Sequence, residues 1–164
     1  MSAAVTWYHD SPVGPLRLEA DGDHLSVLHF ENEPVPPDVP DANRAHPVIA
    51  AACAQLDEYF AARRRTFELP LRPRGTDFQQ KVWAALTRIP YGATVSYGSI
   101  ARTILAPDAV RAVGAANGAN PIAIVIPCHR VIGSNGSLTG FGGGLPRKRF
   151  LLALEQGGDL TLAL

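Results

Sequence analysis

The feature that most constrains this chain is a continuous apolar run that ends at a cysteine. Residues 120–133 read NPIAIVIPCHRVIG, and a run of this kind predicts a buried strand. The strand would deliver Cys128 at its end, with the side chains of His129 and Arg130 beside it. A free cysteine has a pKa of about 8.5 and is mostly the weakly nucleophilic thiol at neutral pH. Its two neighbours can supply surroundings that lower this pKa, whereas a buried, inert cysteine is the alternative interpretation.

Length and cysteine usage limit the classes of protein. The 164 residues suffice for one domain, or for a small N-terminal unit followed by a larger C-terminal one. The sequence contains no signal peptide, no twin-arginine leader and no apolar run of about eighteen residues, so we expect a cytoplasmic protein with no membrane partner. Cys53 and Cys128 form no CxxC pair and the five histidines are scattered. Neither a disulfide framework nor a metal site is therefore indicated.

Charge is distributed unevenly although the formal net charge is zero. Residues 1–70 hold 5 basic and 11 acidic residues, a net charge of −6, whereas residues 71–150 hold 10 basic and 2 acidic residues, a net charge of +8. A basic C-terminal half is compatible with a polyanionic partner such as nucleic acid, but a solvated basic face is an equally good explanation from charge alone.

The N-terminal part predicts a small antiparallel sheet and one helix. Strand signals occupy residues 4–30 around a turn at 21–23, and residues 31–47 form a surface loop rich in Pro, Asp and Glu. A helix is expected from Pro47, with Cys53 as a packing residue. Its apolar face is formed by Val48, Ala52, Leu56, Tyr59 and Phe60. The proline-containing segment 66–75 separates a domain 1–70 from a domain 75–164.

The C-terminal part predicts closely spaced helices. Thr76 caps a helix that reaches Ile89, Ser96 caps a helix over 97–105, and Pro107 starts a helix that runs to about Asn117. The two helices over 97–105 and 107–117 have the dimensions of a helix-turn-helix.

The second of these helices is unusual for a helix that reads bases. It carries small residues at most positions, and Arg111 is its only long basic side chain. Small side chains let a helix approach another helix, or the minor groove of DNA, where sequence readout is poor. If this helix binds DNA, we therefore expect recognition of shape and backbone.

A glycine-rich segment and a final helix follow the cysteine. Residues 139–144 read TGFGGG, which fits a pocket wall better than a phosphate-binding loop. The last helix is expected to start at Pro146 and to turn Glu155 inward together with its leucines. An inward glutamate requires a partner.

Together, these motifs resemble those of the O6-alkylguanine-DNA alkyltransferases, also called methylated-DNA–protein-cysteine methyltransferases. The resemblance covers about residues 75–156, through GTDFQQKVW, IPYGATVSYGSIA, RAVGAANGANP, IPCHRVIG, GFGGG and RKRFLLALE in the family's order. It implies an α+β (α/β) fold, with a ribonuclease H-like N-terminal domain and a mostly helical C-terminal domain that contains a helix-turn-helix. It also implies direct-reversal DNA repair by a monomer, associated with the nucleoid, that acts on double-stranded DNA carrying O6-alkylguanine. The resemblance leaves O4-alkylthymine open as a second substrate.

The resemblance also assigns the chemistry. Cys128 would be the alkyl acceptor, His129 its base through a bound water, and Glu155 the residue that orients His129. Asn120 would brace the active-site turn, and Tyr97 would donate a proton toward the departing guanine. The stable thioether makes each molecule act once, without a cofactor or a metal.

The remaining implied roles concern DNA and the base pocket. Arg111 would fill the gap left by a flipped nucleotide. The other DNA-binding residues would be Ser96, Ala112, Gly114 and Ala116. The base pocket would be lined by Asn117, Val131, Phe141 and Gly142.

The sequence departs from common members of the family at Ala119, Phe141 and Gly142. The small Gly142 predicts tolerance of alkyl groups bulkier than methyl.

Two alternative functions belong to other classes of protein. A lesion-binding sensor would carry another residue, often tryptophan, at the position of Cys128. A Cys-His-Glu hydrolase would work through an acyl-enzyme, but it would leave the smooth helix and Arg111 unexplained.

Overall fold

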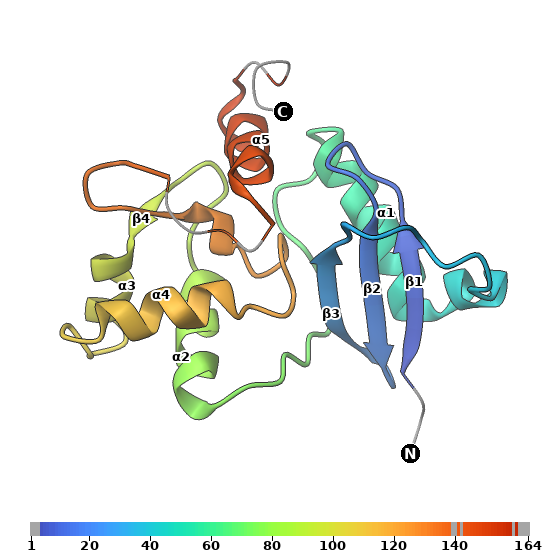
Figure 1. Cartoon of the computed structure of the whole chain (residues 1–164), viewed down its shortest axis with the longest axis horizontal. Helices are drawn as coiled ribbons and strands as arrows, with labels where there is room; N and C mark the ends of the chain where they lie inside the picture. The colour runs from blue at the N-terminus through green and yellow to red at the C-terminus, as the bar shows by residue number, and fades with distance from the viewer. Residues whose placement is uncertain (1–3, 139–140, 142, 159, 161–164) are drawn as a thin grey trace. The chain divides into compact units, whose positions relative to one another are not determined.

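The structure of the chain, a computed structural model, describes residues 4–138, 141, 143–158 and 160. The chain divides into two compact units, Met1–Arg74 and Gly75–Leu164, called here the N-terminal and C-terminal units (Figure 1). Among the helices in the described part of the chain, none has the length and apolarity needed to cross a membrane.

The N-terminal unit contains an antiparallel three-stranded sheet. Strands β1 (Val5–His9), β2 (Leu16–Asp21) and β3 (His24–Phe30) pair in the order β1-β2-β3. Every second side chain of β2 is fully buried, which is the alternation that the sequence shows. The predicted meander is confirmed.

Helix α1 (Pro47–Phe60) contacts β2 and β3 and lies behind the strands in Figure 1. It begins at its proline, as predicted, and follows a short 3₁₀ helix η1 (Asp41–Ala45) within the acidic loop. Cys53 is fully buried on α1, and burial raises the pKa of the Cys53 thiol to about 11. This confirms its interpretation as a packing cysteine.

The C-terminal unit contains three mutually packed helices, α2 (Asp77–Leu86), α3 (Tyr97–Thr103) and α4 (Val110–Gly118). Thr76 caps α2 in a reciprocal capping box with Gln79. The indole of Trp83 on α2 donates a hydrogen bond of 2.8 Å to the carbonyl of Ala116, which ties α2 to α4.

The predicted start of the third helix at Pro107 is wrong, since α4 begins at Val110. The backbone takes a left-handed conformation at Leu105, with φ of 61°. The amide of Ala106 then donates back to the carbonyl of Ala101 and closes the end of α3. The chain consequently needs a further turn before it can begin α4.

The predicted strand within the apolar run is also wrong. Residues 121–127 form buried turns, in which Ile124 has φ of 71° and the amide of Ile126 donates to the carbonyl of Ile122. Pro121 and Pro127 lack the N–H groups that a sheet would use. Local and side-chain hydrogen bonds therefore serve much of this backbone in place of a regular strand.

Short pairing begins only after the cysteine. Strand β5 (Val131–Ile132) pairs in parallel with β4 (Val95–Ser96), which directly precedes α3. The final helix α5 (Leu145–Gln156) packs against the 3₁₀ turn η2 (Cys128–Arg130). Strand β5 follows this turn directly, and strand β4 leads into α3, so the pairing brings the segment that carries Cys128 beside the start of α3.

Candidate active site

Cys128 opens the buried turn η2 and is 6% exposed. Its amide donates to the carbonyl of Ile126 at 2.8 Å. The side chain of Asn120 spans the turns before it, because Nδ2 donates to the Ile126 carbonyl at 2.7 Å and Oδ1 accepts from the Ile122 amide at 3.0 Å. Asn120 thus fixes the backbone that leads into Cys128.

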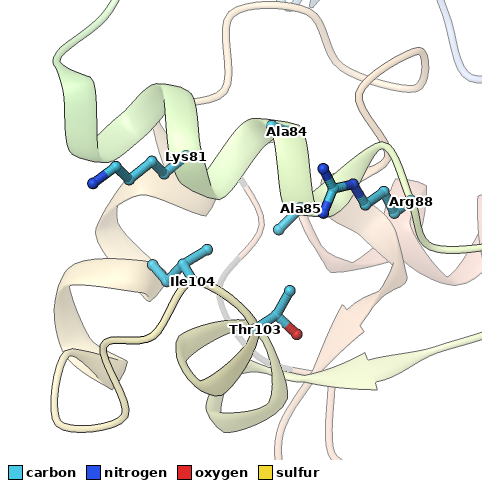
Figure 2. A pocket seen from close by; sticks show the side chains of 6 residues that line it. All are labelled: Lys81, Ala84, Ala85, Arg88, Thr103 and Ile104. Carbon is cyan, nitrogen blue, oxygen red and sulfur yellow. The ribbon is translucent and has the colours of Figure 1, made fainter.

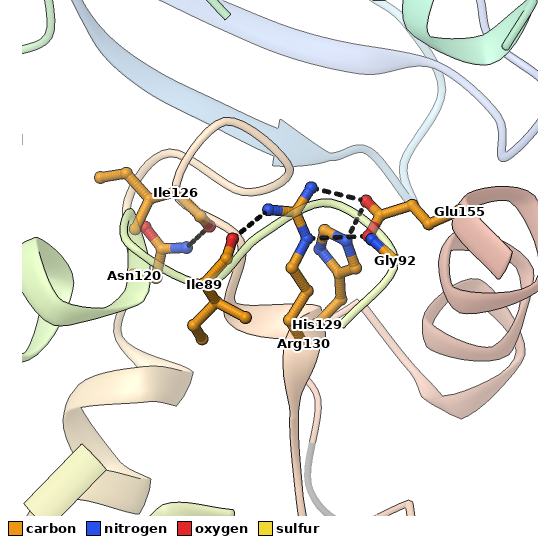
Figure 3. A network of polar contacts seen from close by, with 7 residues as sticks. All are labelled: Ile89, Gly92, Asn120, Ile126, His129, Arg130 and Glu155. Carbon is orange, nitrogen blue, oxygen red and sulfur yellow. Dashed lines mark hydrogen bonds and ion pairs between the residues drawn. The ribbon is translucent and has the colours of Figure 1, made fainter. Parts of the chain in front are cut away.

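Glu155 on α5 is the centre of a buried polar network (Figure 3). Its Oε2 accepts hydrogen bonds from His129 Nε2 at 2.7 Å and from Arg130 Nη2 at 3.0 Å. Its Oε1 accepts from Arg130 Nε at 2.8 Å and from the amide of Gly92 at 3.3 Å. The predicted need of Glu155 for a partner is confirmed, and the network ties the turn before β4 to η2 and α5.

The network determines the tautomer of His129. A carboxylate held by a permanently charged guanidinium is ionised and can only accept hydrogen bonds, so His129 Nε2 must carry a proton. Burial lowers the pKa of His129 and so favours the neutral ring. The hydrogen bond to Glu155 and its charge act in the opposite direction. The remaining nitrogen, Nδ1, is buried and has no hydrogen-bond partner among the described residues. Neutral His129 therefore presents an unoccupied proton acceptor.

The cation that acts on the thiol is Lys148, which the sequence analysis missed. Burial raises the pKa of the Cys128 thiol, while a hydrogen bond from Asn120 and the positive charge of Lys148 act in the opposite direction. Lys148 is fully buried on α5, and its Nζ donates to the carbonyl of Val131 at 2.6 Å. Its position two turns before Glu155, on the same helix face, was the available signal.

Arg130 was expected beside the thiol but is turned elsewhere. Its guanidinium pairs with Glu155, donates to the carbonyl of Ile89 at 2.7 Å and lies over the ring of Tyr91. The difference follows from the tight turn η2, in which successive side chains diverge, so adjacency in sequence does not place a guanidinium on its neighbour.

The candidate DNA-binding residues lie on α4 and at the N-cap of α3. Arg111 and Ala112 are exposed on α4, and Gly114 is half-buried, with the Tyr97 ring 4.0 Å from the point where a Cβ would stand. Ser96 caps α3 by accepting a hydrogen bond from the amide of Ser99 at 3.0 Å.

Ala116 departs from this expectation. Its side chain is 2% exposed and its carbonyl accepts from Trp83, so it packs α4 against α2 and lies away from the surface that Arg111 occupies. The helical period explains this, because a residue five positions after Arg111 lies on the opposite side of the helix.

The candidate base-pocket residues have different environments. Asn117 is buried and its Nδ2 donates to the Cys128 carbonyl at 3.4 Å, while its Oδ1 has no partner among the described residues. Val131 is fully buried, and the ring of Phe141 has Lys148 Nζ 6.0 Å from its centroid. Gly142 lies outside the described residues.

A separate depression of about 220 Å³ lies between α2 and the end of α3 (Figure 2). None of the candidate catalytic or pocket residues lines it, so it is distinct from the Cys128 site. Its lining residues are Lys81, Ala84, Ala85, Arg88, Thr103 and Ile104. Within the described ranges, no group of three His, Cys, Asp or Glu residues is arranged to hold a metal ion.

Comparisons with known proteins agree on one family. Residues 77–157 match the family model described as 6-O-methylguanine DNA methyltransferase, DNA binding domain, and residues 5–73 match its ribonuclease-like domain. The methylated-DNA–protein-cysteine methyltransferase of Mycobacterium tuberculosis is 52% identical over 156 residues, which cover 93% of this chain and 94% of the relative. That of Methanosarcina acetivorans is 48% identical over 147 residues, which cover 89% and 94% of the two chains.

A solved structure gives the same result. The crystal structure of Mycobacterium tuberculosis OGT in complex with DNA superimposes with a TM-score of 0.84 and 50% identity, covering 95% of this chain and 96% of that chain. The agreement spans both units, so the α+β fold class expected from the sequence is confirmed. The chain therefore belongs to the 6-O-methylguanine DNA methyltransferase family.

Proposed function

We propose that this protein is a methylated-DNA–protein-cysteine methyltransferase that repairs O6-alkylguanine in duplex DNA by transferring the alkyl group to Cys128. The observation that best supports this proposal is the state of the buried His129, which directly follows Cys128 in the turn η2. Its Nε2 is hydrogen-bonded to Glu155, and its Nδ1 is available as a proton acceptor. The family membership and the near-complete coverage of the relatives support the same activity.

In the proposed reaction, His129 Nδ1 takes the Cys128 thiol proton through a bound water. The thiolate attacks the alkyl carbon in line, an S–C bond forms, and the bond between that carbon and guanine O6 breaks. Guanine leaves with the bond's electron pair and receives a proton from Tyr97, which regains one from solvent. The thiol proton is thus replaced by the alkyl group, and guanine is restored in the DNA.

Lys148 lowers the barrier to forming the thiolate. Burial lowers the pKa of Lys148, but its ammonium favours the charged form of Cys128 and the thiolate in turn favours the ammonium. This mutual effect offsets part of the desolvation that otherwise keeps the thiol protonated. The buried cation thus stabilises the nucleophile before it attacks.

The helices α3 and α4 are the proposed DNA-binding element, so residues 75–164 carry both binding and alkyl transfer. Arg111 is exposed beside the small residues Ala112 and Gly114, which allow close approach to the minor groove. A buried base must be flipped out of the duplex at a cost of a few kcal/mol. Arg111 would offset part of this cost by filling the vacated space.

The product is a thioether, which water does not cleave, so the protein is consumed with one lesion each. It works as a monomer, without a cofactor, in the cytoplasm in association with the nucleoid. This stoichiometry separates the proposal from a lesion-binding sensor, which removes nothing, and from an acyl-enzyme hydrolase, which turns over.

The DNA product tests the proposal. A duplex with one O6-methylguanine is incubated with increasing amounts of protein, and the restored guanine is quantified after digestion to nucleosides. The proposal requires guanine to rise in proportion to protein and to stop at equimolarity, and it requires Cys128→Ser to restore none. Catalytic turnover, or repair by Cys128→Ser, would refute it.

A matched variant separates DNA handling from chemistry. Arg111→Ala should slow repair of the duplex but leave reaction with free O6-benzylguanine unchanged, because the free base needs no flipping. Arg149→Ala, which removes an exposed arginine from α5 outside the proposed DNA-binding element, is the control for the loss of one positive charge.

A further inference from the structure

Arg130 is a buried arginine that has no part in the proposed bond-making steps. It is 6% exposed and donates through Nε and Nη2 to both carboxylate oxygens of Glu155. A third donor, Nη1, is 2.7 Å from the carbonyl of Ile89, in the turn that follows α2. Burying a guanidinium is costly unless it is fully paired, so this arrangement calls for a reason.

The reason concerns the proton on His129. An ionised carboxylate 2.7 Å from a buried imidazole favours the imidazolium. An imidazolium donates from both ring nitrogens and cannot accept a proton from Cys128. Glu155 therefore orients the base and at the same time opposes the burial that favours its neutral form.

We propose that Arg130 is a positioning residue that acts through Glu155: it holds the carboxylate in place and neutralises its charge, so that His129 rests as a neutral ring with Nδ1 able to accept a proton. This rests on the proposed function, in which His129 is the base. Glu155 then keeps its orienting hydrogen bond without trapping a second proton.

The other charged groups around His129 are consistent with this role. Burial has the largest effect and lowers the pKa of His129; Glu155 raises this pKa, and Arg130 and Lys148 lower it further. Lys148 bonds the carbonyl of Val131, while Arg130 is bonded directly to the carboxylate that His129 contacts. Arg130 is therefore the cation that offsets the negative charge of Glu155 at the carboxylate itself.

The geometry also requires an arginine at this position. The planar guanidinium contacts both oxygens of Glu155 and reaches Ile89 with its remaining arm, whereas an ammonium is a single point charge. The amide of Gly92 donates to the same carboxylate, so the pair also holds the turn from Ile89 to Gly92 that precedes β4 and Tyr97. A lysine would retain charge but lose this alignment.

The protonation of His129 gives a direct test. Nitrogen chemical shifts of the His129 ring are followed against pH by NMR in the wild type, Arg130→Met and Arg130→Lys, with Arg149→Met on the exposed side of α5 as the charge control. In the wild type and the control, Nδ1 should stay unprotonated at pH 7. In Arg130→Met its titration should move up by about one to three pH units, with a smaller shift in Arg130→Lys.

Reaction rates give the second readout. The acid side of the rate profile with free O6-benzylguanine should move upward by the same amount, so that Arg130→Met recovers activity as the pH is raised. An unchanged His129 titration, or a rate that falls by the same factor at every pH, would show a purely structural role and overturn the proposal. If Arg130→Met does not fold, Arg130→Lys decides by the same criteria. Because the titration needs no DNA, a wild type that failed to transfer alkyl groups would refute the proposed function and leave the Arg130 result interpretable.

Discussion

The side chain of Asn120 donates a 2.7 Å hydrogen bond to the carbonyl of Ile126, two residues before the cysteine that the site is built around. The same side chain accepts from the amide of Ile122, so one amide serves two buried backbone groups. Asn120→Ala removes the acceptor of the Ile122 amide and leaves the Ile126 carbonyl with the Cys128 amide as its remaining donor, so it should lower the free energy of unfolding by about 1–3 kcal/mol.

Urea denaturation measures this loss. Asn135→Ala is the matched control, because Asn135 also bonds a nearby backbone amide but in an exposed turn, and its loss should cost less than about 1 kcal/mol. Equal effects of the two substitutions would contradict the bracing role of Asn120.

Lys148→Met tests the buried cation. Methionine fills much of the same space but removes the positive charge that favours the Cys128 thiolate. Alkyl transfer from free O6-benzylguanine at neutral pH should slow by about tenfold for each unit by which the thiol pKa rises. Arg149→Met removes an exposed charge from the same helix and should leave this rate unchanged. A rate insensitive to Lys148→Met would exclude the electrostatic role.

The pH dependence of alkyl transfer follows from His129. Burial lowers its pKa below the ordinary value of 6.5. As the pH falls through this lowered pKa, the ring gains a proton and the Nδ1 acceptor is lost. The single-turnover rate should therefore keep its base-dependent component down to pH 6.5 and lose it below that value. A loss of half the rate already above pH 7 on the acid side would show that His129 rests as the imidazolium.

Leu105 carries backbone strain without a packing gain. Its φ is 61° and its side chain is 89% exposed. A non-glycine residue in this region costs about 1–2 kcal/mol, so Leu105→Gly should raise the free energy of unfolding by up to about 1 kcal/mol after the entropy of glycine is counted. Thermal denaturation measures this gain. Leu105→Ala keeps the strained backbone, so its free energy of unfolding should change little. If both variants gain equally, the exposed leucine, and not its backbone, is the cause.

The sequence predicted what depends on periodicity and caps. The meander, the start of α1 at Pro47, the cap at Thr76 and the inward Glu155 follow from local patterns that the packing reinforces. The family and its fold class were available from the motifs of the C-terminal part.

What the sequence did not show depends on contacts between distant residues. The buried run before Cys128 looks like a strand, but Asn120 and two prolines let it satisfy its backbone in turns. Arg130 was expected beside the thiol because it is near in sequence, yet Glu155, 25 residues away, takes its guanidinium. Lys148 lies in a basic run of the kind that is usually solvent-exposed. It is buried because α5 packs onto η2, a contact that the local sequence does not show.

If Cys128 becomes a permanent alkyl acceptor, the mass of the protein must change in the reaction. The protein is incubated with duplex DNA containing O6-methylguanine, measured intact by mass spectrometry, and digested to locate the change. We expect one added methyl group on Cys128 that persists on storage, and none on Cys53, whose thiol has its pKa raised to about 11 by burial. An unmodified protein after the lesion has been removed, or a methyl group on any other residue, would contradict it.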